Sequence, residues 1–275
     1  MSDYNETTPC SLIEAAMREI FVQYGHETRL GRKSLSKYGL NAAVTSSGRF
    51  DINSFSVGSA ATETYLTTNA VTHFSSDVDA ADRGLPVYIE GMTRSGDILT
   101  FTVQTVYLDA SDARTKTALD TPLCDVTRVR TAATGNVYIY EDGAVTNGEP
   151  DDATIIHNVG VAGEGSSLKA ATSVASNNYF LVLGLYASIG RASSTNVVDF
   201  RFQEAQLGDA ILGDAFVTKL MPWSVGAGTD IRGPLGPKGY HITRPNSRVK
   251  VVGQASGGTI NAKAGFFGVF LDIPT

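Results

Sequence analysis

Residues 98–108, Ile-Leu-Thr-Phe-Thr-Val-Gln-Thr-Val-Tyr-Leu, decide the fold class of this chain. The apolar residues Leu99, Phe101, Val103 and Tyr107 recur at every second position. Because successive side chains of a β-strand point to opposite faces, this period of two predicts a strand rather than a helix. The abundance of Thr, Val and aromatic residues in the segment favours the same structure.

Similar strand-forming runs occur on both sides of this segment, and short turns rich in Gly, Asn and Asp separate them. The clearest turns are Glu141-Asp142-Gly143 and Thr146-Asn147-Gly148. The expected strands cover residues 63–69, 86–90, 98–108, 124–131, 136–141, 154–159, 178–189, 197–203, 215–220, 239–244, 248–255 and 258–272. Because no helical pattern lies between these runs, we expect a mainly β chain built of antiparallel β-sandwich or jelly-roll units.

One amphipathic helix is expected at the N-terminus, over residues 11–25. Its apolar residues have the spacing of one helical face. Ser11 is a favourable N-cap with Glu14 three positions later, and Gly25 is placed to end the helix. A basic, polar segment follows, which is typical of a solvated connector or of an arm that docks on an acidic neighbour. The apolar stripe and the basic arm supply the candidate partner-binding residues: Leu12, Ile13, Met17, Ile20, Phe21, Arg29, Arg32 and Lys33.

The acidic, proline-containing stretch 149–152 marks the expected boundary between two β units. The helix and its connecting arm then occupy residues 1–61. The first β unit occupies residues 62–148, and the second, jelly-roll-like unit occupies residues 149–275.

Composition restricts the possible partners. The chain has 275 residues, of which 42% are hydrophobic and 18% are charged, so it can bury a core and does not resemble a disordered chain. The formal net charge of -6 supplies no general attraction for nucleic acid or anionic lipid, so we expect neither as a partner.

No stretch approaches the roughly 20 apolar residues of a membrane span. The polar, acidic N-terminus does not have the pattern of a signal peptide, so synthesis in a cytosol is expected.

Known catalytic and metal-binding motifs are absent from the sequence. It contains no G-x-S-x-G elbow, no phosphate-binding P-loop and no H-E-x-x-H helix. Asp77, Asp79 and Asp82 are closely spaced but do not match an EF-hand, and we interpret them as a solvated acidic loop. Trp223, next to apolar residues, is interpreted as part of a core. We therefore expect no cofactor, no metal and no enzymatic activity.

Several β segments resemble structural proteins of tailed bacteriophages. Ile89-Glu90-Gly91-Met92 followed by Thr105-Val106-Tyr107-Leu108-Asp109 is similar to a pattern in that group, and so is the closing run 264–272. Where the group has Leu-Asn-Gly, this chain has Leu108-Asp109-Ala110. The likeness extends over residues 62–275. It implies a virion component, such as a head decoration or cement protein, a neck piece or a tail protein, and it carries over no catalytic residue.

The leading hypothesis is therefore a structural virion protein, made in the host cytoplasm, that forms homo-oligomers and binds capsid, portal or tail proteins. Free strand edges and many copies on a symmetric particle would supply the binding strength. A receptor- or carbohydrate-binding virion protein is the alternative, with Tyr138, Tyr140, Tyr179, Tyr186 and Trp223 as candidate sugar contacts. A polysaccharide-degrading enzyme that acts through paired carboxylates is a third possibility.

Overall fold

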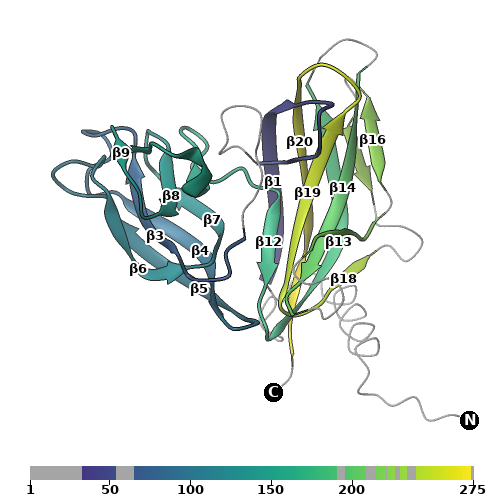
Figure 1. Cartoon of the computed structure of the whole chain (residues 1–275), viewed down its shortest axis with the longest axis horizontal. Helices are drawn as coiled ribbons and strands as arrows, with labels where there is room; N and C mark the ends of the chain where they lie inside the picture. Colours follow the sequence, from purple (N-terminus) through teal and green to yellow (C-terminus); the bar gives the residue numbers. More distant parts are fainter. Residues whose placement is uncertain are drawn as a thin grey trace, which may run out of the picture.

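The computed structural model describes residues 33–53, 65–190, 196–208, 215–220, 222–226, 230–233 and 240–273. These residues form antiparallel β-sheets in two units that lie side by side (Figure 1). The expectation of a mainly β chain is confirmed, and within the described ranges the only helical segment is the short 3-10 turn η1 (Ala153–Ile155). None of the helical structure in these ranges is long and apolar enough to cross a membrane. The expected helix over residues 11–25 lies outside the described residues.

The larger unit, which we call the main sandwich, consists of two antiparallel sheets. One sheet has the order β1 (Lys33–Val44), β20 (Ile260–Asp272), β13 (Asn178–Ile189) and β17 (Asp230–Gly233), and β18 (His241–Thr243) also pairs with β13. The other has the order β12 (Ala171–Val174), β19 (Ser247–Ala255), β14 (Val197–Gln206) and β15 (Val217–Thr218), with β16 (Trp223–Gly226) on β14 and β2 (Phe50–Asp51) on β19. Phe202 of one sheet meets Phe266 of the other edge to face, with ring centroids 5.6 Å apart, so apolar side chains between the sheets form the core.

The smaller unit, which we call the inserted unit, lies between β2 and β12 in the sequence and on the left of Figure 1. Its strands are β3 (Val71–Ser76), β4 (Pro86–Ser95), β5 (Ile98–Tyr107), β6 (Thr117–Leu123), β7 (Asp125–Thr131), β8 (Val137–Glu141), β9 (Val145–Thr146), β10 (Glu149–Pro150) and β11 (Ile156–Gly160). They form sheets of order β11-β8-β3-β6 and β5-β4-β7, and a β9–β10 pair. Phe74, Ile89, Val129 and Ile139 belong to the apolar core that both sheets share.

The observed strand pairing does not follow the domain boundaries expected after residues 61 and 148. Strands β1 and β2 pair with β20 and β19, so residues 33–53 belong to the main sandwich and not to a connecting arm. Strand β11 pairs with β8, so the inserted unit extends to Gly160. The turns before residue 152 separate strands of one unit, because local turn chemistry does not show to which sheet the chain returns.

The sequence pattern did not predict strand β1, because the buried face of this strand carries polar residues. Lys37 and Asn41 are buried on the same side as Leu35, whereas Tyr38 points outward. The Asn41 side-chain amide donates to the Asp51 carbonyl at 2.8 Å, which satisfies a polar group inside the sandwich. A strand with Lys and Asn at buried positions lacks the apolar alternation on which sequence recognition depends.

Other strand predictions had mixed outcomes. The segment 98–108 is confirmed as β5. The strand expected over residues 63–69 is wrong where it can be judged, because residues 65–70 are irregular and β3 begins at Val71. Trp223 stacks on Phe200 of the main core with centroids 5.9 Å apart, which confirms its core assignment.

Candidate binding site between the two units

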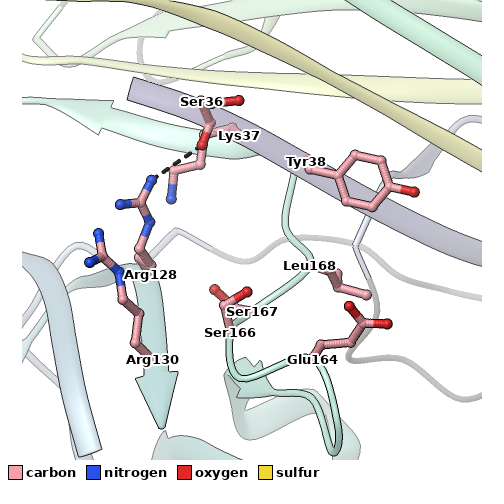
Figure 2. Close-up of a pocket in the computed structure, with 9 residues that line it drawn as sticks. All are labelled: Ser36, Lys37, Tyr38, Arg128, Arg130, Glu164, Ser166, Ser167 and Leu168. Carbon is pink, nitrogen blue, oxygen red and sulfur yellow. Dashed lines mark hydrogen bonds between the residues drawn. The ribbon is translucent and has the colours of Figure 1, made fainter. Parts of the chain in front are cut away.

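A cavity of about 440 Å³ opens where β7 of the inserted unit passes β1 of the main sandwich (Figure 2). It is lined by Ser36, Lys37, Tyr38, Arg128, Arg130, Glu164, Ser166, Ser167 and Leu168. The first three residues lie on β1, the two arginines lie on β7, and the others lie in the loop between β11 and β12. Three segments that are far apart in the sequence thus meet at one site.

The two arginines of β7 point to the same side of their sheet, because two positions separate them along the strand. The Arg128 Nη2 donates to the Ser36 carbonyl at 3.2 Å, and this hydrogen bond joins the two units (Figure 2). Glu90 of β4 accepts from Arg130 Nη2 at 3.2 Å and lies 3.6 Å from Arg128 Nη1. The Arg130 side chain remains 55% exposed. The single Glu90 carboxylate therefore interacts with two guanidinium groups. Because one negative charge balances only one of the two positive charges, this wall of the cavity is cationic.

Lys37 lies at the base of this wall with only 4% of its surface exposed. Its ammonium group donates to the Thr127 carbonyl of β7. Burial lowers the pKa of Lys37 to about 7, and repulsion from Arg128 and Lys169 contributes in the same direction. A negatively charged group bound in the cavity would favour the protonated form of Lys37.

The loop between β11 and β12 forms the neighbouring wall. The Val129 N–H donates to the Ser167 hydroxyl oxygen at 3.1 Å, and Ser166 forms an isolated β-bridge with Arg130. The loop therefore follows β7 and is held by its backbone. It brings two hydroxyl groups and the Glu164 carboxylate to the cavity (Figure 2).

Tyr38 supplies an aromatic surface at the edge of the cavity. The residue is 37% exposed, and its ring stacks on Tyr186 of β13, with centroids 5.8 Å apart and an interplanar angle of 15°. The Tyr186 hydroxyl donates to the Lys37 carbonyl. Burial raises the pKa of Tyr186, which keeps this hydroxyl protonated. The stacked Tyr186 ring therefore holds the Tyr38 ring in place.

A nearly inaccessible charged cluster joins the two units close to Lys37. Asp125 of β7 accepts from Lys169 Nζ at 3.2 Å and from the hydroxyl of Ser173 in β12. Lys169 also donates to the Val126 carbonyl at 2.8 Å. Burial alone would raise the pKa of Asp125, but the charges of Lys169 and Arg248, together with the hydrogen bonds from Ser173 and Lys169, lower the pKa below its usual value. Asp125 is therefore ionised, and its partners fix the two units against each other.

The side of the sheet that carries the arginines continues away from the cavity as an exposed surface. In the strand register, Tyr88 of β4 lies between Arg130 of β7 and Thr105 of β5. Tyr88, Val103 and Tyr107 share this side of the sheet and are 51%, 50% and 63% exposed. We call these three residues the exposed sheet face. It is an aromatic and apolar patch directly beside the cationic wall.

The predicted partner-binding residues cannot be compared with this site. Leu12, Ile13, Met17, Ile20, Phe21, Arg29 and Arg32 lie outside the described residues. Lys33 is the first residue of β1 and is paired in register with Phe270, and its role in binding stays a prediction. Neither the cavity nor the exposed sheet face was predicted. The alternation Arg128-Val129-Arg130 within an expected strand could have indicated a cationic sheet face, but Lys37 and Glu164 carry no local signal.

The aromatic residues considered as sugar contacts do not form a common exposed surface. Tyr138 and Tyr140 are buried in the inserted unit, and Trp223 packs on the main core. Tyr179 is half-buried, and Tyr186 lies behind the ring of Tyr38. Period-two alternation identifies a strand but does not show which of its faces a second sheet covers, so Tyr38 was overlooked.

The acidic loop around residues 77–82 is part of the structure and is not simply solvated. Asp82 is fully buried and accepts from Ser76 Oγ at 2.6 Å, Thr134 N at 2.7 Å and Gly135 N at 3.1 Å. Burial would raise the pKa of Asp82, but these hydrogen bonds lower it overall. Across the part of the chain that the structure describes, no group of three or more His, Cys, Asp and Glu residues is arranged to hold a metal ion.

Together these observations define a mainly β protein whose described residues form two units with a cationic cavity between them. No protein-family model and no curated protein matches the sequence.

Among solved structures, the chain is similar to one of infectious bursal disease virus, Gx strain, at 10% identity and a TM-score of 0.25, covering 88% of this chain and 72% of that chain. The N-terminal CBM22-1-CBM22-2 tandem domain of Xyn10C from Paenibacillus barcinonensis is 8% identical, with a TM-score of 0.24 and coverage of 90% and 95%. The VP2 subviral particle of infectious bursal disease virus is 7% identical, with a TM-score of 0.18 and coverage of 94% and 82%. At such scores these likenesses carry no argument about function.

Proposed function

We propose that this chain is a structural virion protein, of the tailed-bacteriophage kind that its sequence resembles, which self-associates and acts by binding rather than by catalysis. The observation that carries the proposal is the exposed sheet face formed by Tyr88, Val103 and Tyr107. Exposed apolar patches with polar rims mark protein interaction sites, and Tyr and Arg are enriched at interface centres. Here the aromatic patch borders two arginines.

A second copy of this chain is the partner that fits the exposed sheet face. In a two-fold contact the same patch meets itself, so it must be apolar or carry balanced charge. The rim of this patch contains Glu90 next to Arg128 and Arg130, and it therefore presents charges of both signs. In addition, β5 carries Val103 and Tyr107 and lies at the edge of its described sheet, where a strand of another copy can pair.

Self-association is tested with the double variant Tyr88→Ser/Tyr107→Ser. The matched control is Ile98→Ser, because Ile98 is 54% exposed on the same strand β5 but points to the other side of the sheet. Molar mass is measured by light scattering over a concentration series, and folding by circular dichroism. We expect oligomers for the wild type and the control, and a dissociation constant raised about 100-fold or more for the folded double variant. A monomeric wild type, or equal loss in the control, would contradict the proposal.

The place of the chain in a virion is tested on purified particles of the virus that encodes it. Quantitative mass spectrometry of the particles should find this chain at a fixed copy number relative to the main shell protein. Its absence from washed particles would refute the virion assignment, whatever its oligomeric state in solution.

A further inference from the structure

We propose that the cavity between β1 and β7 binds an acidic saccharide, with the carboxylate of a uronic-acid-type sugar on Arg128 and Arg130 and the sugar ring on Tyr38. This site borders the contact proposed for the exposed sheet face and shares Arg128 and Arg130 with its rim, whereas Tyr38 belongs to the cavity and Tyr88 and Tyr107 to the exposed sheet face. It adds a small-molecule or glycan ligand to the proposed structural role.

The cationic wall accounts for the carboxylate. Arg128 and Arg130 both line the cavity, and a guanidinium group can bind a carboxylate through two parallel hydrogen bonds. Glu90 interacts with both arginines and therefore neutralises at most one of their two charges. Lys37 lies on the same wall and adds positive charge when it is protonated. Glu164 adds a second carboxylate to the lining, but it lies away from the two arginines (Figure 2), so an anion would meet positive charge locally, against the wall formed by Arg128 and Arg130.

The other lining residues favour a saccharide over other anions. A cavity of about 440 Å³ lies within the usual range of small-ligand sites and has room for one or two sugar rings. The exposed face of Tyr38 can pack against the C–H face of a sugar ring, and Ser166 and Ser167 offer hydroxyl groups for hydrogen bonds. Glu164 can accept hydrogen bonds from sugar hydroxyl groups, which the side chains of an acidic peptide do not offer.

The site is organised before a ligand arrives. Tyr38 is stacked on Tyr186, Arg128 is bonded to the Ser36 carbonyl, and Ser167 is held by the Val129 N–H. Because these side chains are already placed, binding would lose little conformational entropy. Figure 2 shows the two arginines and the two serines around one open space, with Tyr38 at its edge.

The proposal is tested by calorimetric titration of the full chain with glucuronate and with a short polyuronate. Glucose is the neutral control, and a short polyglutamate peptide represents an acidic protein segment. We expect saturable binding of the two uronates and no binding of glucose or of the peptide. Binding of the peptide alone, equal binding of glucose and glucuronate, or no heat with either uronate would overturn the proposal.

Three cavity variants locate the site. Arg130→Gln and Tyr38→Ala should each raise the dissociation constant for the uronate about tenfold or more, and Arg130→Lys should raise it less. Arg83→Gln is a control for a partly exposed arginine that pairs with a carboxylate elsewhere, and Tyr107→Ala is a control for an exposed tyrosine on the neighbouring face. Unchanged affinity in all three cavity variants, with thermal unfolding showing each to be folded, would refute this location.

The outcomes also separate the two proposals. Tyr88→Ser/Tyr107→Ser should lose self-association and keep uronate binding. Tyr38→Ala should keep self-association and bind the uronate more weakly. If the uronate bound only to the oligomeric form, the site would depend on the subunit contact, and the proposed independence of the cavity would be wrong.

Discussion

Buried charge is the dominant feature of the junction at the scale of single residues. Lys37, Asp125, Lys169 and Arg248 are all almost inaccessible to solvent. Removing such groups from water costs several kcal/mol for each ion, and the cost is offset only when partners are well placed. Here Asp125 and Lys169 pair directly, and Ser173 adds a hydrogen bond. The partners come from both units, so the charges specify how the units meet.

Asp125→Asn should therefore be strongly destabilising. The change removes the negative charge that Asp125 places beside the buried Lys169 ammonium group, and we expect the free energy of unfolding to fall by about 3–5 kcal/mol. Asp120→Asn is the matched control, because Asp120 is exposed on β6, and its effect should stay within about 0.5 kcal/mol. Urea denaturation measures both. Equal stability of the two variants would show that the buried pair contributes nothing.

Lys37→Met should change how stability depends on pH. The pKa of Lys37 is about 7 in the folded chain, whereas an exposed lysine has a pKa of 10.5, so the unfolded chain binds more protons between these pH values. The wild type therefore gains stability from this group as the pH rises above 7. A methionine does not titrate, so the variant should be more stable relative to wild type at pH 7 than at pH 9.5.

Urea denaturation at several pH values between 7 and 9.5 measures this difference. The difference in unfolding free energy, variant minus wild type, should decrease steadily with pH. Parallel curves for the two proteins would show that Lys37 keeps an ordinary pKa in the fold.

At the scale of elements, β5 shows how far a periodic pattern extends. Leu99 is buried at one end against Ala175 and Leu207 of the main sandwich. Val106, which points to the other side of the sheet, is buried at the other end in the core of the inserted unit. The alternation predicts the strand, but neither face is covered along its whole length. The side of β5 that carries Leu99, Val103 and Tyr107 is therefore mainly apolar along its length, but it is buried at Leu99 and exposed at Val103 and Tyr107.

Strand β1 depends on a close backbone approach at Gly39. A Cβ atom at this position would lie 1.9 Å from the Ile52 carbonyl oxygen and 2.6 Å from Ala170 N. Gly39→Ala must therefore move β1 away from its neighbours, and we expect a loss of about 1–3 kcal/mol of stability. Gly48→Ala is the control, since its Cβ would meet open space, and it should stay within about 0.5 kcal/mol. Thermal unfolding compares the two, and a tolerant Gly39 would contradict this packing.

At the scale of the whole molecule, the chain begins the main sandwich, leaves it to build the inserted unit, and returns to complete it. The described strands β1 and β2 precede the inserted unit, and β12 follows it. The Arg128 hydrogen bond to Ser36 and the Asp125 cluster then tie the inserted unit to the sandwich. Because the Asp125 cluster is buried and ionic, loosening one unit exposes charges whose partners belong to the other.

The two units should consequently unfold together. Scanning calorimetry of the wild type should give one transition, with a calorimetric enthalpy close to the van't Hoff enthalpy. In Asp125→Asn the ratio of calorimetric to van't Hoff enthalpy should rise above one, because the units then unfold more independently. Two separate transitions in the wild type would show that the junction does not couple the units.

The sequence by itself determined the mainly β, antiparallel character of the chain, because the period-two pattern of segments such as 98–108 and the glycine-containing turns are local properties. It also located most long strands. Only the tertiary structure decided that β1 pairs with β20, and that Lys37, Arg128 and Glu164 line one cavity. Pairing and burial between distant segments depend on which surfaces meet after folding, and a lysine that will be buried has the same local sequence signature as one that stays in water.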